Sequence, residues 1–261
     1  MQIRKKIIDF YINSSLHVAF AVFCLLQITL LSNHLNPIKH FSITVFCGTI
    51  VGYNFLKYFE LIVKGIFFKK RFLPIIVVTI LSTIGLIFSF FCLNFTIQKY
   101  LILSGLLVLV YPMLRKQGWL KMFLVSFVVT YITVYIPFQA EKRLFFLFDI
   151  NLIQRFIIII CLLIPFEILD SKTDLVSMNT IPQKFGIKKT KLLGYILLLL
   201  YIVLDFFKFN FEYNLLLIDV VIAILIGIFI YFSRVDRTKY YTSFWVESVP
   251  IFWWILLLIF C

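Results

Sequence analysis

Charged residues are scarce in this sequence, and acidic residues are the scarcest. Asp, Glu, Lys and Arg together make up 14% of the 261 residues, while 62% are hydrophobic and the mean hydropathy is +1.04. A soluble domain of this size has about 25% charged residues and about 45–50% apolar residues. Because a soluble fold could not bury so much apolar surface, the composition excludes that class and predicts an integral membrane protein.

Cysteine pairs and histidine clusters are also absent from the sequence. The five cysteines form no C-x-x-C pair and lie within or at the end of apolar runs, so we interpret them as packing residues. The three histidines lack the spacing of metal ligands. The net charge of +13 comes from basic residues in short gaps between apolar runs, without an aromatic and basic groove pattern, so we expect no nucleic-acid partner.

Apolar runs of roughly 17–22 residues, the length of a membrane-crossing helix, occur nine times along the chain. No low-complexity linker and no change of composition divides them. We therefore predict a single transmembrane domain over residues 1–261, with an all-α fold of nine transmembrane helices. The predicted spans are approximately 10–31, 41–62, 73–93, 97–114, 119–138, 150–169, 191–207, 214–232 and 244–260.

The distribution of Lys and Arg predicts the orientation of this bundle. With the N-terminus in the cytoplasm, 19 of the 25 basic residues fall in segments on the inner side. The asymmetry repeats at every loop and agrees with the positive-inside rule. We therefore predict a multi-pass protein of the inner or plasma membrane, in contact with membrane lipid, with a cytoplasmic N-terminus and an outer C-terminus.

Three acids lie close together at the inner end of the sixth predicted span. On a helix Asp170 and Asp174 are about 40° apart, and Glu167 is within about 60° of Asp170. Three carboxylates on one stripe repel one another unless a cation lies between them, and Mg²⁺ prefers such hard oxygen ligands. The alternative is a solvated helix end, in which Lys172 and the nearby basic loop neutralise the acids.

The same segment resembles the second motif of the UbiA superfamily of intramembrane prenyltransferases. That family has D-x-x-x-D followed by K-T-L-P and a glycine, and this chain has Asp170-x-x-x-Asp174 followed by Asn-Thr-Ile-Pro-Gln-Lys-Phe-Gly over 179–186. The placement after the sixth of nine helices, on the cytoplasmic side, also agrees. Tyr111-Pro-Met-Leu-Arg115 resembles the family's Y-x-x-x-K element, with Arg in the Lys position.

The resemblance implies a UbiA-like bundle and a Mg²⁺-dependent prenyltransferase. Such an enzyme transfers a prenyl group from an isoprenyl diphosphate to a lipophilic acceptor at the cytoplasmic leaflet. Asp170 and Asp174 would be the catalytic metal ligands, with Glu167 as a supporting carboxylate and Glu60 as a further candidate. The implied contacts to the diphosphate are Asn54, Lys57, Tyr111, Arg115 and Lys172.

The family's first motif, N-D-x-x-D-x-x-x-D after helix two, is mostly missing. Asn54 is present, but Phe55, Tyr58 and Ile62 stand at the three Asp positions, and Glu60 is out of register by two residues. Half of the usual metal cage is therefore absent, and two hypotheses follow.

In the first hypothesis the ammonium group of Lys57 replaces a metal ion and contacts phosphate directly. In the second, Lys57 and Glu60 form an i,i+3 pair near the membrane interface. The chain would then be a non-catalytic member of the fold that binds an isoprenoid or lipid, or serves as a subunit of a membrane complex.

Other acids in the apolar runs have simpler interpretations. Asp205 and Asp219 lie near the outer side, where Lys208 is the expected partner of both. Trp245 and Glu247 begin the ninth span and are interpreted as interface anchors. A small transporter fits less well, because transporter cores have broken helices and polar groups at mid-membrane, whereas the polar groups of this sequence cluster at helix ends.

Overall fold

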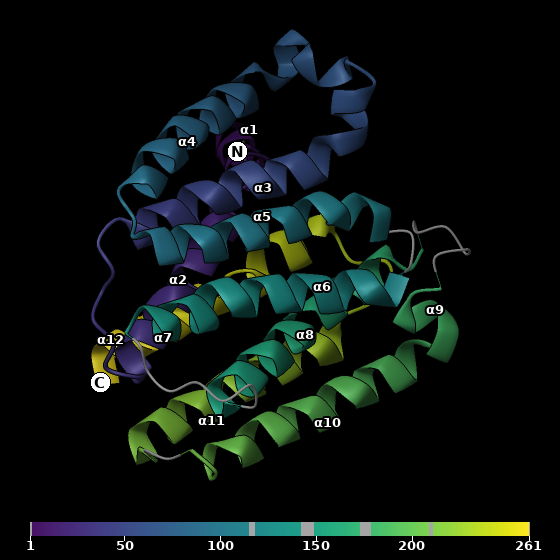
Figure 1. Cartoon of the computed structure of the whole chain (residues 1–261). Helices are drawn as coiled ribbons and strands as arrows, with labels where there is room; N and C mark the ends of the chain where they lie inside the picture. The colour runs from purple at the N-terminus through teal and green to yellow at the C-terminus, as the bar shows by residue number, and fades with distance from the viewer. Residues whose placement is uncertain (1, 115–117, 142–148, 173–178, 209–210, 261) are drawn as a thin grey trace.

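The computed structural model describes residues 2–114, 118–141, 149–172, 179–208 and 211–260, and within these ranges all regular structure is helical (Figure 1). Long helices lie side by side, and short loops join them, as the alternation of apolar runs and gaps predicts. The α-helices are α1 (Gln2–Asn13), α2 (Leu16–Ser32), α3 (Phe41–Val63), α4 (Leu73–Phe91), α5 (Phe95–Leu114), α6 (Gly118–Thr130), α7 (Ile136–Ala140), α8 (Ile150–Asp170), α9 (Ile181–Phe185), α10 (Ile187–Asp205), α11 (Tyr213–Phe232) and α12 (Val249–Phe260).

Six helical segments of the described chain are long and apolar enough to cross a membrane, and the bent pair formed by α1 and α2 makes a seventh. This confirms an all-helical chain with several helices of membrane-spanning length. The remaining two predicted spans, 41–62 and 191–207, coincide with α3 and with most of α10. These helices have 23 and 19 residues, and they are less apolar than the six segments counted above. The count of nine spans stays a prediction.

The first predicted span, 10–31, is not one continuous helix. The chain bends by 60° between α1 and α2. Ser15 adopts a left-handed backbone conformation, with φ 63°, which an L-residue other than glycine rarely adopts. The three residues at the break, Asn13, Ser14 and Ser15, are polar, but apolar runs on both sides of them made the segment resemble one continuous span.

Two other spans contain π-helical turns. The turn η3 (Tyr131–Tyr135) connects α6 to α7, and η5 (Tyr241–Val246) precedes α12. Pro250 is the second residue of α12, a position where proline costs a helix little. The ninth span is therefore one helical segment, Tyr241–Phe260, whose hydrogen-bond pattern changes from π-helical to α-helical just before its proline. Single π-helical turns often occur at functional sites.

The helices pack in a closed order around an interior. Contacts run in turn from α2 to α3, α5, α6 and α8, and from α8 through η5 and α12 back to α2. The helix α4 lies outside α3, and α10 and α11 lie at the opposite edge of the bundle (Figure 1).

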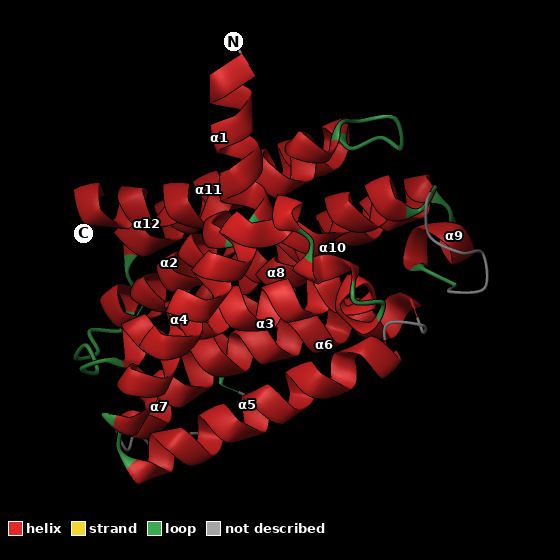
Figure 2. Cartoon of the chain, turned by 90° about the horizontal axis from the view of Figure 1, so that it is seen from above, coloured by secondary structure: helices red, strands yellow, loops and turns green. Residues whose placement is uncertain are grey.

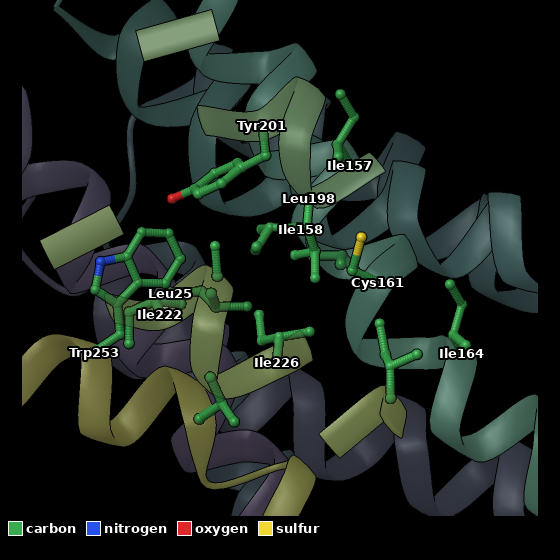
Figure 3. Close-up of a cluster of buried hydrophobic side chains, with 14 of the residues drawn as sticks. Leu25, Ile157, Ile158, Cys161, Ile164, Leu198, Tyr201, Ile222, Ile226 and Trp253 are labelled. Atoms are coloured by element: carbon green, nitrogen blue, oxygen red, sulfur yellow. The ribbon is translucent and has the colours of Figure 1, made fainter. Parts of the chain in front are cut away.

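The largest apolar core lies among α2, α8, α10, α11 and α12. Ile158, Ile222 and Ile226 are fully buried there, and Tyr201 and Trp253 close the cluster on one side (Figure 3). Gly194 permits a close approach of α10, since a Cβ atom at this position would lie 2.8 Å from Ile230 Cδ1 and 2.9 Å from Ile164 Cδ1. Small residues allow such close helix contacts in membranes.

Candidate functional site

The candidate site residues lie toward the C-terminal ends of α3, α5 and α8, which are on the same side of the bundle (Figure 1). Arg115 and Asp174 lie outside the described residues, so the structure does not place them. The residues that it places are Asn54, Lys57 and Glu60 on α3, Tyr111 on α5, Glu167 and Asp170 on α8, and Lys172 just after α8.

Tyr53 marks the point where several of these helices converge. Its side chain interacts electrostatically with Glu247, Tyr111 and Asp170, which come from three other parts of the chain. The Tyr53 residue is 38% exposed, yet the surrounding protein desolvates its hydroxyl group. Its hydroxyl group therefore lies near acidic and phenolic groups from other parts of the chain, although the residue keeps part of its surface exposed.

Lys57 follows Tyr53 by one helical turn and belongs to the same cluster. Its ammonium group interacts electrostatically with Glu247. It also donates a hydrogen bond to the carbonyl oxygen of Ile12, at 3.2 Å, and contacts Asn13 Oδ1 at 3.5 Å. Lys57 therefore links α3 to the C-terminal end of α1 and to the residue that follows η5.

Asn54 uses its amide group to hold the break between α1 and α2. Its Nδ2 donates to the carbonyl oxygen of Ser14, at 3.2 Å, and to Thr79 Oγ1, at 2.9 Å. Its Oδ1 accepts a hydrogen bond from the Ser15 hydroxyl at 2.6 Å. Asn54 is only 2% exposed. Both amide protons are engaged within the protein, so the structure gives Asn54 a positioning role, and its predicted contact with a diphosphate stays a prediction.

Tyr58 takes part in the same arrangement. Its hydroxyl donates to the carbonyl oxygen of Asn13 at 2.8 Å, and its ring packs against Phe67 and Phe72, with centroids 5.0 Å and 5.8 Å away. The last carbonyls of a helix have no partner within that helix. Lys57, Tyr58 and Asn54 thus donate to the carbonyls of Ile12, Asn13 and Ser14 at the end of α1, of which the Ile12 carbonyl also accepts the N–H of Ser15. We call these three residues the α3 clamp.

The predicted ion pair between Lys57 and Glu60 is not present. No salt bridge joins these two described residues, although both are exposed and separated by three positions. Lys57 turns instead toward Ile12 and Glu247, because these partners lie on the side of α3 that faces the bundle. That part of the second hypothesis is therefore wrong, whereas a non-catalytic role stays open.

Glu167 is engaged by a cation. It is buried, and its Oε1 lies 3.1 Å from Nζ of Lys121 on α6. A buried carboxylate is stable when a cation compensates its charge. Lys121 was not recognised as a site residue from the sequence, because the two partners lie on different helices at no recognisable spacing.

A magnesium site is not complete among the residues that the structure describes. No group of three His, Cys, Asp or Glu side chains within these ranges is placed to hold a metal ion. Glu167 is paired with Lys121, and Glu60 is exposed at the end of α3. Of the predicted acidic ligands, Asp170 lies at the site and Asp174 lies outside the described residues. The described residues alone do not fit the metal, and Mg²⁺ stays a prediction.

Glu247 is a third site residue, besides Tyr53 and Lys121, that the sequence interpretation missed. Trp245 is 59% exposed, as expected of an interface anchor, but Glu247 is partly buried and interacts electrostatically with Lys57 and Tyr53. The N–H group of Glu247 donates to the carbonyl of Thr242 at 3.2 Å, five residues earlier. This π-helical bond changes the direction of the side chains that follow. The signal was an acid inside an apolar run, which is a functional candidate by default.

A second polar cluster lies at the other end of the bundle. Lys208 Nζ is 2.6 Å from Asp205 Oδ1 and 3.6 Å from Asp219 Oδ2, which is the partnership expected from the sequence. Arg155 is buried beside it and donates to the carbonyl oxygen of Leu25 and to Thr29 Oγ1, both at 3.0 Å. These contacts connect α2, α8, α10 and α11. A cavity of about 40 Å³ adjoins the cluster.

Comparison with known proteins does not assign the chain to a class. No family model, no curated protein and no solved structure matches it. The function is therefore inferred from the site itself.

Proposed function

We propose that the chain is a membrane protein of nine spans that binds an isoprenyl diphosphate and transfers its prenyl group to a lipophilic acceptor at the cytoplasmic leaflet. In this proposal the bundle is UbiA-like, with the N-terminus inside the cell. One observation carries it. Electrostatic interactions connect Tyr53 and Lys57 on α3 with Tyr111 on α5, Asp170 on α8 and Glu247 after η5, on the side predicted to be cytoplasmic.

The chemistry of this site suits a lipid with an anionic head. The ammonium group of Lys57 supplies positive charge, and the hydroxyl groups of Tyr53 and Tyr111 can donate hydrogen bonds to phosphate oxygens. The apolar surfaces of the surrounding helices can hold a prenyl tail. Arg115 and Lys172 are further candidates for the diphosphate, from the ends of α5 and α8.

Magnesium belongs to the proposal through Asp170 and Asp174, with Glu167 and Glu60 as weaker candidates. When bound, a divalent cation would stabilise the negative charge on the diphosphate leaving group. The described residues do not complete such a site. The proposed contacts of Lys57, Tyr53 and Tyr111 with the diphosphate are therefore independent of the metal.

A non-catalytic member of the same fold is the second candidate, and the α3 clamp favours it. Asn54, Lys57 and Tyr58 occupy the segment that resembles the first aspartate-rich motif, and all three hold the end of α1. Such a protein would bind an isoprenoid or another lipid, or act as a subunit of a membrane complex, without transferring a prenyl group.

Ligand-induced stabilisation tests the binding step. A non-hydrolysable prenyl diphosphate should raise the melting temperature of the detergent-solubilised protein, and more so with Mg²⁺ than without it. The Asp170→Ala/Asp174→Ala variant should lose the part of this rise in melting temperature that depends on Mg²⁺. Asp236→Ala removes an exposed acid from the loop 233–238 and serves as the matched control, which should retain the Mg²⁺-dependent stabilisation.

A turnover assay separates the two candidates. Membranes that contain the protein are supplied with a hydrolysable, radiolabelled prenyl diphosphate and lipid extracts as acceptors. Release of diphosphate together with a labelled lipid product supports transfer. Stabilisation by the analogue without turnover supports a non-catalytic protein that binds an isoprenoid. No stabilisation at saturating ligand contradicts prenyl transfer and leaves the subunit of a membrane complex as the remaining candidate.

A further inference from the structure

The N-terminal helix α1 presents an unusual arrangement of polar and apolar faces. Asp9 receives a hydrogen bond from the Tyr240 hydroxyl, and Asn13 Oδ1 lies beside Lys57, so polar side chains of α1 face the protein. Ile7 is 62% exposed, and it is roughly 160° from Asp9 around the helix. In a helix that faces water this arrangement would be reversed. The outer face of α1 is therefore suited to lipid.

The direction of α1 agrees with that environment. The bend of 60° from α2 turns α1 away from the direction of the long helices, and Figure 2 shows it projecting from the side of the bundle. If α2 runs along the membrane normal, a helix bent by this angle lies closer to the membrane plane. The α3 clamp and the contact between Asp9 and Tyr240 hold it there. The same contact raises the pKa of Tyr240, since the hydroxyl is a donor to the Asp9 carboxylate.

Basic residues accompany this apolar face. Lys5 and Lys6 are exposed on α1, and Arg4 precedes them in the sequence. Apolar side chains on one face with adjacent lysines are typical of helices that lie in the interface of a membrane with anionic lipids. Ile8 and Phe10, at 39% and 38% exposed, extend the apolar surface.

We propose that α1 is an in-plane helix that docks on an anionic lipid surface, with Ile7 and Phe10 inserted among the acyl chains and Lys5 and Lys6 on the headgroups. The inference does not depend on prenyl transfer or on the number of spans, and it requires only that α2 crosses the membrane. The partner is the anionic phospholipid of the surrounding membrane, identified by the charge of α1 and by the apolar face that the protein leaves uncovered.

Site-specific photocrosslinking in nanodiscs tests the proposal. The full chain carries the Ile7→p-benzoylphenylalanine substitution and is placed in phosphatidylcholine, or in an equal mixture of phosphatidylcholine and phosphatidylglycerol. Lipid adducts on the N-terminal peptide are measured by mass spectrometry. The same substitution at Leu199, 65% exposed on α10, gives the value for a lipid-facing site, and Asp236, in an exposed loop, gives the value for an aqueous site.

The adduct yield at Ile7 is expected to approach that at Leu199 and to be higher in the anionic nanodiscs. In those nanodiscs, Lys5→Gln/Lys6→Gln should lower the yield about fivefold or more, since each lysine near an anionic surface contributes about a fivefold preference. Lys69→Gln/Lys70→Gln removes the same amount of charge from the segment between α3 and α4 and should leave the adduct yield at Ile7 unchanged. A yield at Ile7 as low as at Asp236, or one that is equal in both lipids, would overturn the proposal.

Discussion

The Ser15 hydroxyl donates a hydrogen bond of 2.6 Å to Asn54 Oδ1, across 39 positions of the chain. This contact joins the left-handed residue between α1 and α2 to the middle of α3. It places the bend beside Tyr53 and Lys57, so the break in the first span and the candidate site form one structural unit.

Replacing Asn54 by alanine is expected to destabilise the protein by about 2–3 kcal/mol. The substitution removes three hydrogen bonds and leaves the Ser14 carbonyl and the Ser15 hydroxyl without their buried partner. Reversible unfolding in mixed detergent micelles measures the loss. Asn36→Ala, at an exposed position, is the matched control and should change stability by less than about 0.5 kcal/mol. Equal effects of the two substitutions would contradict the clamp.

Lys57 and Glu247 are expected to be energetically coupled. In a double-mutant cycle with Lys57→Met and Glu247→Gln, the interaction energy should be about 0.5–1 kcal/mol, because the two opposite charges interact electrostatically at a partly exposed position. A parallel cycle with Lys57→Met and Glu60→Gln should give a value near zero, since no salt bridge joins these two described residues. A larger coupling in the second cycle than in the first would show that Lys57 faces Glu60 and not the interior of the bundle.

The pair of Lys121 and Glu167 should behave as a buried salt bridge. Lys121→Met removes the cation and leaves the Glu167 carboxylate uncompensated, so stability should fall by about 3–5 kcal/mol. Lys121→Met/Glu167→Gln should recover most of the loss, because the second substitution removes the charge. The free energies of unfolding of the two variants test this pairing. A double variant as unstable as the single variant would refute it.

Arg155 is expected to stabilise the opposite end of the bundle without affecting ligand binding. Arg155→Met should cost about 2–4 kcal/mol, since it breaks two buried hydrogen bonds from a charged group to α2. Arg234→Met, at an exposed position, should be nearly neutral. The folded Arg155→Met variant should bind a prenyl diphosphate with the same affinity as the unchanged protein. A loss of affinity in the folded variant would show that the ligand binds near Arg155 and not near Tyr53 and Lys57.

The long helices could be predicted from the sequence, because apolar runs of membrane-spanning length and the alternation of basic loops are local properties. Each predicted span overlaps a helix of the structure. The break at Ser15 was not predictable in this way, since apolar residues lie on both sides of it and the groups that stabilise it come from α3.

The candidate site was predictable only in part. Lys57, Tyr111 and Asp170 could be selected because they are polar residues at helix ends, and the structure brings them near Tyr53 or Glu247. Glu247 was assigned to the interface because the π-helical turn that redirects it leaves no mark in the hydrophobic pattern. Lys121 and Glu167 meet through helix packing, which spacing along one helix cannot reveal.

The most direct test of the central claim is to map where a photoreactive prenyl diphosphate binds. We expect adducts on α3 near Tyr53 and on the segment after η5 near Glu247, which unlabelled prenyl diphosphate suppresses and the corresponding prenyl alcohol does not. Labelling confined to lipid-facing positions of α4 or α10, or equal competition by the alcohol, would contradict a diphosphate site inside the bundle.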